Sequence, residues 1–186
     1  MGRNELIVAG WVLVEETPTS EIAGHTLTGR LVTISDCIQA DLPRPDTWLG
    51  DWFQDPDQAR VARDADAPGA SIVTVAMDPR DASAFMGEFT DEVAPWFDLL
   101  RTRTPLAPQT RVIGWEVVGA EEYLDLHSWH CHDYAEDASA ALEIGLTDRG
   151  LLRTADDARR VLTWMLSLPS DDAPEEVPWT VVALAV

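Results

Sequence analysis

Three of the four histidines of this chain and one of its two cysteines lie within ten residues, DLHSWHCHDY at 125–134. Imidazole nitrogen and thiolate sulfur are donors that zinc prefers, and catalytic zinc takes three protein ligands and a water. On a helical turn the side chains at 127, 130 and 131 would share one face, whereas on a strand those at 130 and 132 would point the same way. Either geometry predicts a candidate zinc site, and this histidine cluster comprises His127, His130, Cys131 and His132.

Three interpretations of the histidine cluster stay open. As a metal site it matches no strong signature, since HExxH, a CxxC pair and the deaminase pattern are all missing, and only the first part of a cupin motif fits. As a nucleophilic site it would pair Cys131 with a histidine, although catalytic pairs meet across a fold and not as sequence neighbours. In the interpretation that we favour, Trp129 and Cys131 are buried, while the histidines cap backbone groups or face solvent.

The sequence contains no other catalytic motif. It lacks the GxSxG of serine hydrolases, the phosphate-binding GxxxxGK[ST] and the dinucleotide-binding GxGxxG. All thirteen basic residues are arginine, so no lysine is present for Schiff-base chemistry or for a phosphate-binding loop. These absences favour a protein that is not an enzyme.

Acidic residues dominate the charge of the chain. There are 33 acidic against 13 basic residues, which gives a formal net charge of -20. A field of this sign repels nucleic acid phosphates and anionic lipid surfaces, so we expect neither to bind directly. The same field attracts a basic protein partner and speeds its encounter with the chain.

The stretch PDTWLGDWFQDPD at 45–57, the acidic–aromatic segment, is the candidate partner-binding surface. Aromatic anchors surrounded by carboxylates suit the apolar stems and cationic ends of arginine and lysine. The alternative is that its rings cover the core from a long loop. The residues that we expect to bind a partner are Asp46, Trp48, Asp51, Trp52, Phe53, Asp55 and Asp57.

Hydrophobic patterning predicts the elements that position these groups. Apolar or alternating runs predict strands at 5–15, 28–36, 71–77, 110–120 and 177–186. Capping residues and helical spacing predict helices at 57–64, from Asp81 through Met86, at 91–102, from Asp133 through Leu142, and from Thr154 to Pro169.

The mixture of strands and helices has no regular strand–helix–strand rhythm. This favours an α+β fold with a mixed or antiparallel sheet and helices packed against it. The length of 186 residues fits a single domain, 1–186, with an irregular segment at 41–69. Two cysteines make no disulfide framework, and the apolar run at 6–14 is too short to span a bilayer, so we expect a cytoplasmic protein.

Four motifs follow one another in the C-terminal part of the chain: GWEVVG, HSWHC, LEIGLTDRGLL and VPWTVV. In this order, over residues 111–186, the chain resembles small bacterial proteins of the immunity type, which are encoded beside polymorphic toxins and inhibit them. The resemblance carries over no functional residue. It implies a cytoplasmic protein that blocks a toxin by covering its active site or an adjoining surface.

The sequence thus leads to three hypotheses. The first is an acidic binding protein that inhibits a basic toxin or nuclease. The second is a metal-dependent enzyme that uses the histidine cluster with zinc. The third is a nucleic-acid mimic that inhibits a DNA-binding protein.

Overall fold

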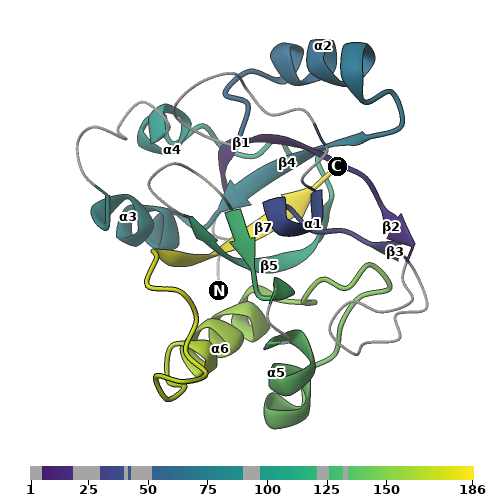
Figure 1. Cartoon of the computed structure of the whole chain (residues 1–186). Helices are drawn as coiled ribbons and strands as arrows, with labels where there is room; N and C mark the ends of the chain where they lie inside the picture. The colour runs from purple at the N-terminus through teal and green to yellow at the C-terminus, as the bar shows by residue number, and fades with distance from the viewer. Residues whose placement is uncertain are drawn as a thin grey trace.

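The centre of the computed structural model is a five-stranded antiparallel sheet with strand order β1-β4-β7-β5-β6 (Figure 1). The structure describes residues 6–18, 30–39, 42, 52–89, 97–120, 126–131 and 134–186. The strands of the sheet are β1 (Ile7–Val14), β4 (Ser71–Met77), β5 (Val112–Ala120), β6 (Leu126–Ser128) and β7 (Trp179–Ala185). A separate antiparallel pair is formed by β2 (Thr17–Pro18) and β3 (Arg30–Leu31). The expected α+β class with an antiparallel sheet is confirmed.

The terminal strand β7 lies in the middle of the sheet, between β4 and β5 (yellow in Figure 1). Six of its seven residues are buried. A strand that is covered on both faces has no solvent side to carry polar residues, so its sequence is almost continuously apolar. This placement explains why the run at 177–186 has so few polar side chains.

Helices cover both faces of the sheet, because successive residues of its strands point to opposite sides. Val118 of β5 packs with residues of α3 (Pro79–Gly87) and α4 (Asp98–Thr102) on one face. Val117, its neighbour, packs on the other face with α5 (Tyr134–Leu142) and α6 (Ala155–Met165). At the far end of that second face, α2 (Pro56–Asp66) covers Leu13 of β1.

Local capping signals explain where several helices begin. Thr154 accepts a hydrogen bond from the backbone nitrogen of Asp157 at 3.0 Å, as the sequence predicted for α6. The predicted cap of α3 was wrong: Asp78, not Asp81, is its N-cap and accepts from the nitrogen of Arg80 at 2.9 Å. Because Pro79 fits the first position of a helix, the helix starts earlier than the apolar pattern indicated.

The strand predicted at 28–36 is much shorter in the structure. Of the described residues in this range, which begin at Arg30, Arg30 and Leu31 pair as a strand. The chain then runs through a buried stretch, 32–35, into the short helix α1 (Asp36–Gln39). The backbone of this stretch is bonded elsewhere: Val32 N donates to the carbonyl oxygen of Arg149, and Ile34 N donates to the side chain of Glu116. A β-ladder is therefore unnecessary to satisfy these groups.

Two predicted elements fall partly outside the described residues. The helix predicted at 91–102 is seen from Asp98 onward as α4, and residues 90–96 are not described. The predicted cap Asp133 of α5 also lies outside the described residues, whereas the helix through Leu142 is present. Within the described ranges no helix is long and apolar enough to cross a bilayer.

Candidate functional site

A fully buried carboxyl group, that of Glu116, lies on β5 close to the middle of the sheet. Three donors point at it: the hydroxyl of Thr33, the hydroxyl of Ser128 at 2.6 Å, and the backbone nitrogen of Ile34 at 3.2 Å. The first two reach the same oxygen, and the third reaches the other. The carboxyl group is thus hydrogen-bonded from one side by the buried stretch 32–35 and from the other by the end of β6.

Burial governs the ionisation of Glu116. Removal from water raises its pKa from 4.5 to about 7, and the hydrogen bonds from Ser128, Thr33 and Ile34 lower it only in part. A carboxyl group with such a pKa can bind or release a proton near neutral pH. Strongly perturbed groups of this kind are concentrated at functional sites, which makes Glu116 the starting point for a candidate site.

Hydrogen bonds connect Glu116 to the thiol of Cys131. Ser128, which donates its hydroxyl to Glu116, donates its backbone N–H to Cys131 Sγ at 3.5 Å. On the other side, the nitrogen of Ser35 donates to the Thr33 hydroxyl at 3.1 Å, and Ser35 Oγ lies 3.1 Å from Cys131 Sγ. Cys131 therefore closes a ring of polar contacts that begins at the buried carboxyl group.

These polar contacts continue to the protein surface through Cys37 and His127. Cys37 is exposed on α1, and its Sγ lies 4.0 Å from His127 Nδ1. Its thiol also interacts with that of Cys131, whose pKa is raised to about 11, mainly by burial and further by this neighbour. We call the whole set the thiol–carboxyl network; its members are Thr33, Ser35, Cys37, Glu116, His127, Ser128 and Cys131.

The structure places His127 and Cys131 of the histidine cluster in the thiol–carboxyl network and His130 outside it. His127 is half-buried on β6, next to Cys37, whereas His130 is 5% exposed and its ring lies 4.8 Å from that of Trp129. Among the described residues no three His, Cys, Asp or Glu side chains are arranged to hold a metal ion, and His132 is not described. The zinc site with these four ligands stays a prediction.

The interpretation that we favoured was only partly right. Trp129 is fully buried, as expected, and Cys131 is half-buried. His130 was expected to face solvent or to cap backbone groups; it does not face solvent, because it is buried against the ring of Trp129. Of the two histidines that the structure describes, His127 is the one that stays partly accessible.

The sequence predictions missed five members of the network: Thr33, Ser35, Cys37, Glu116 and Ser128. Two of these, Glu116 and Cys37, are the ionisable groups among them. Glu116 could have been found, because it is a single carboxylate in the interior of the run VIGWEVVGA, and a charge in such a run must be paired or neutralised. Cys37 could not, since it is 90 residues away from His127 along the chain and lies in no recognisable motif.

The acidic–aromatic segment is described only from Trp52 onward. Phe53 is 3% exposed and exchanges two backbone hydrogen bonds with Trp11 of β1, at 3.0 and 2.8 Å. Trp52 packs over Gly10, where an added Cβ would lie 2.7 Å from the Cβ of Trp52. These two rings therefore cover the core, which is the alternative given above.

The acidic residues of the segment have mixed positions. Asp55 caps α2 by accepting from the nitrogen of Asp57 at 2.8 Å, and the carboxylate of Asp57 pairs with Arg60. The residues predicted to bind a partner that lie outside the described part are Asp46, Trp48 and Asp51. Whether the segment contacts a partner stays a prediction.

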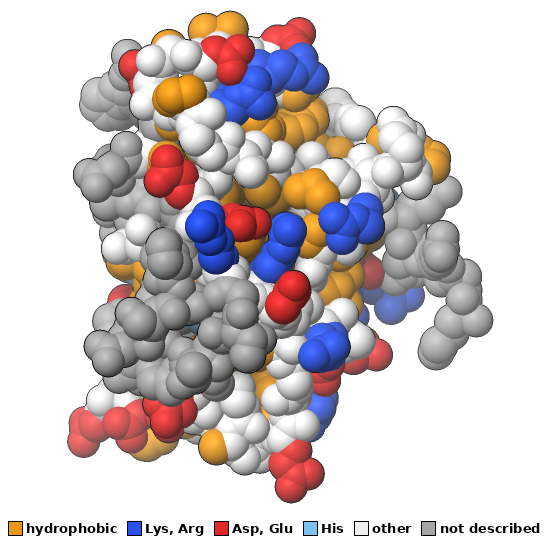
Figure 2. Space-filling view, turned by 90° about the vertical axis from the view of Figure 1, so that its right-hand side faces the viewer, with side chains coloured by type: hydrophobic (Ala, Val, Ile, Leu, Met, Phe, Trp, Pro, Cys, Tyr) orange, Lys and Arg blue, Asp and Glu red, His pale blue; other side chains and the backbone are white. Residues whose placement is uncertain are grey.

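The outward side of α2 presents an exposed hydrophobic residue among polar ones. Val61 is 70% exposed, more than any other large hydrophobic side chain that the structure describes. On a helix, residues three or four positions apart lie on the same side, and the residues at these distances before and after Val61 are all exposed. We call this the α2 face; it consists of Asp57, Gln58, Val61, Asp64 and Ala65. In Figure 2, hydrophobic, acidic and arginine side chains are intermixed around α2 at the top of the view.

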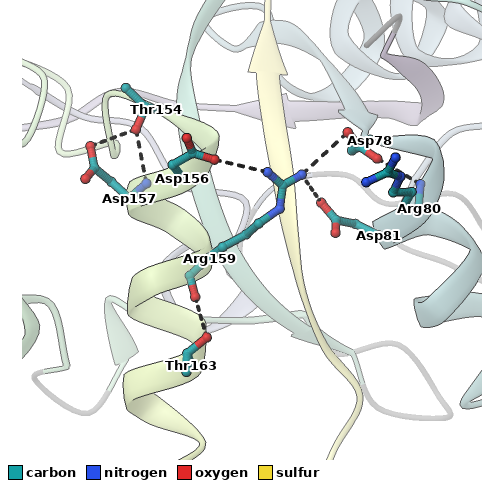
Figure 3. A network of polar contacts seen from close by, with 8 residues as sticks. All are labelled: Asp78, Arg80, Asp81, Thr154, Asp156, Asp157, Arg159 and Thr163. Atoms are coloured by element: carbon teal, nitrogen blue, oxygen red, sulfur yellow. Dashed lines mark hydrogen bonds and ion pairs between the residues drawn. The ribbon is translucent and has the colours of Figure 1, made fainter. Parts of the chain in front are cut away.

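A surface hollow of about 410 Å³ adjoins α6 and is lined by Leu142, Arg159, Arg160, Thr163, Trp164 and Ser167. Its arginines are already engaged. Arg159 reaches Asp81 at 2.8 Å, Asp156 at 3.4 Å and Asp78 at 3.5 Å, and so ties α6 to α3 (Figure 3). Arg160 donates to the carbonyl oxygen of Leu142 at 2.7 Å and pairs with Asp157. Both arginines therefore hold α6 to its neighbours, Arg159 to α3 and Arg160 to the end of α5.

No protein family, curated protein or solved structure matches this chain.

Proposed function

We propose that the chain is an acidic binding protein that inhibits a basic protein partner, in the manner of an immunity protein. The α2 face carries the proposal, because Val61 is exposed there without an internal packing role. An apolar side chain bordered by Asp57 and Asp64 offers a partner both a desolvated contact and charge pairing at its rim. The stem of an arginine or lysine of the partner would pack over Val61. Its cationic end would replace Arg60 at Asp57 or Arg63 at Asp64, where both carboxylates are exposed.

The charge of the whole chain supports a basic partner. With a formal net charge of -20, the chain attracts positively charged proteins over a distance set by the ionic strength. Nucleases and other toxins that act on phosphates carry basic surfaces, so an acidic inhibitor is steered to the surface that it must cover. Long-range attraction would thus bring the basic partner to the chain, and contacts on the α2 face would then hold it.

The partner to test is the protein encoded by the reading frame next to that of this chain, because immunity proteins are encoded beside their toxins. We expect the two purified proteins to bind at low salt, with a dissociation constant that rises as salt is added. The variant Val61→Arg should raise the dissociation constant about tenfold or more, since it places a like charge and a bulky side chain at the contact. Binding is measured by calorimetry.

A matched control exists at the end of α6. Leu166 is 59% exposed, so Leu166→Arg adds the same side chain at a similarly exposed position on another surface. This variant should bind like the wild type. No binding by the neighbouring protein, or equal loss of binding in both variants, contradicts the proposal. Release of the partner by added DNA would instead identify a DNA-binding target and favour the nucleic-acid mimic.

A further inference from the structure

We infer that Cys37 and Cys131 form a reversible oxidation site, in which Cys37 reacts with a hydroperoxide and Cys131 then closes an intramolecular disulfide. This site lies in the thiol–carboxyl network and is independent of the α2 face. The two cysteines are 94 positions apart in the sequence, and their meeting depends on α1 packing against β6.

The placement of the two thiols assigns them different roles. Cys37 is exposed on α1, so an oxidant in solution reaches it first. Cys131 is half-buried behind it, where Ser35 Oγ at 3.1 Å and the backbone N–H of Ser128 at 3.5 Å hold its sulfur. Ser35 is two residues before Cys37, and Ser128 follows His127, whose Nδ1 lies 4.0 Å from Cys37 Sγ, so both sulfurs lie where α1 meets β6. The second sulfur is therefore close to the first, and Cys37 is also one of the groups that raise the pKa of Cys131.

His127 is placed to take the proton of the attacking thiol. Its Nδ1 lies 4.0 Å from Cys37 Sγ, and the half-buried ring is held on β6. The thiolate is the nucleophilic form of cysteine, so a base at this position promotes the first step. His130, which is buried against Trp129, is turned to another environment and is not expected to take part.

Two steps account for all atoms. In the first, Cys37 sulfur attacks one oxygen of hydrogen peroxide, the O–O bond breaks, and Cys37 becomes a sulfenic acid while the leaving hydroxide takes up a proton as water. In the second, Cys131 sulfur attacks the sulfenic sulfur, and the hydroxyl group leaves with the Cys131 proton as a second water. Two thiols and one peroxide thus give one disulfide and two waters. A dithiol reductant returns the disulfide to two thiols by exchange and is itself oxidised to a disulfide.

The disulfide would fasten the buried stretch before α1 to the turn after β6. That stretch carries Thr33 and Ile34, which bind the Glu116 carboxyl group from one side, while Ser128 binds it from the other. A cross-link between residues 37 and 131 closes a long chain loop and restricts the unfolded state. Oxidation should therefore raise the thermal midpoint of the full chain, by roughly 5 to 10 °C.

The test treats the reduced full-length chain with one equivalent of hydrogen peroxide and follows its intact mass. The expected product is monomeric, lighter by two hydrogens, and yields one linked peptide pair that contains Cys37 and Cys131. Dithiothreitol restores the reduced mass. In Cys131→Ser the product should be heavier by one oxygen, and a sulfenic-acid probe should label Cys37, whereas Cys37→Ser should stay unmodified on the same timescale.

His127→Gln in the Cys131→Ser background tests the base. It should slow formation of the sulfenic acid about tenfold or more while the thermal midpoint of the reduced protein stays close to that of its parent. Unchanged mass of the wild type, disulfide-linked dimers only, or equal reactivity of Cys37→Ser and Cys131→Ser overturns the inference. So does one equivalent of zinc in protein purified without a chelator, because the thiols would then be metal ligands.

Discussion

Glu116 shows how one side chain couples proton binding to the fold. Its carboxylate accepts hydrogen bonds from Thr33, Ser128 and Ile34, yet the pKa in the folded chain stays near 7 because burial outweighs them. The folded state therefore binds a proton at pH values where an unfolded glutamate, with a pKa of 4.5, has lost it. Glu116 therefore stabilises the folded state fully below about pH 4.5, and this stabilisation is lost as the pH rises through about 7.

This pH dependence of the stability gives a prediction for Glu116→Gln. The amide is neutral at every pH; its oxygen can accept from Ile34, and its nitrogen can donate to the hydroxyls of Thr33 and Ser128. Between pH 4.5 and 7 the free energy of unfolding of the wild type should fall relative to the variant, by a total on the order of 3 kcal/mol. Urea unfolding of both proteins across this range measures the difference.

The comparison between the two proteins is needed because other carboxylates titrate in the same range. Their contributions are common to both proteins and cancel in the difference, which isolates the group at 116. A difference that does not change with pH would show that Glu116 is ionised in the folded state at acidic pH, as an exposed glutamate is. It would also remove the main reason to regard Glu116 as part of a functional site.

At the scale of elements, Asp78 and Asp81 allow a matched pair of substitutions in α3. Both carboxylates contact Arg159 of α6, but only Asp78 also caps the helix, and only Asp78 is buried (Figure 3). Asp78→Ala should lower the free energy of unfolding by about 1 to 2 kcal/mol, since it removes a helix cap and leaves an amide unsatisfied. Asp81→Ala removes a partly exposed ion pair and should cost about 0.5 kcal/mol.

Thermal or urea unfolding of the two variants decides between the caps. The sequence placed the start of this helix at Asp81, whereas the structure places it at Asp78. If Asp81→Ala were the more costly substitution, the boundary of α3 in the structure would be wrong. Helical content from circular dichroism is the control that both variants keep their fold.

The elements that the sequence predicted well are those with local causes. The run SIVTVAM is rich in β-branched residues, and β4 has the predicted bounds, 71–77. Thr154 begins α6 because its hydroxyl satisfies a free amide only three residues away. In both cases the cause lies within a few residues along the chain, so the local sequence is sufficient to predict the element.

Long-range contacts decide what the sequence could not predict. The stretch 32–35 has the composition of a strand, but its backbone bonds to Arg149 and to Glu116, more than eighty residues downstream. The candidate site is of the same kind. The sequence indicated a site made of neighbouring residues, the histidine cluster. In the structure, however, His127 contacts the exposed Cys37, and the packing of α1 against β6 brings these two residues together.

At the scale of the whole molecule, net charge opposes folding. The chain has 33 acidic and 13 basic residues, so its folded state concentrates about twenty uncompensated negative charges at neutral pH. Ion pairs such as Arg60–Asp57 and Arg101–Asp98 act in the other direction, but their side chains are largely exposed, and exposed pairs contribute little each. Repulsion is therefore expected to be the larger electrostatic effect.

Screening should then stabilise the chain. When sodium chloride is raised from about 0.01 M to about 0.15 M, the Debye length falls from roughly 30 Å to roughly 8 Å, which weakens repulsion between distant carboxylates more than attraction within contacting pairs. We expect the thermal midpoint to rise by several degrees over this range and to change little with an equal concentration of a neutral osmolyte such as glycine. A midpoint that falls with salt would mean that paired arginines, and not excess carboxylates, dominate the electrostatics of folding. In that case the acidity would be arranged locally to suit a partner, and the salt dependence of binding should be confined to the surface that the partner covers.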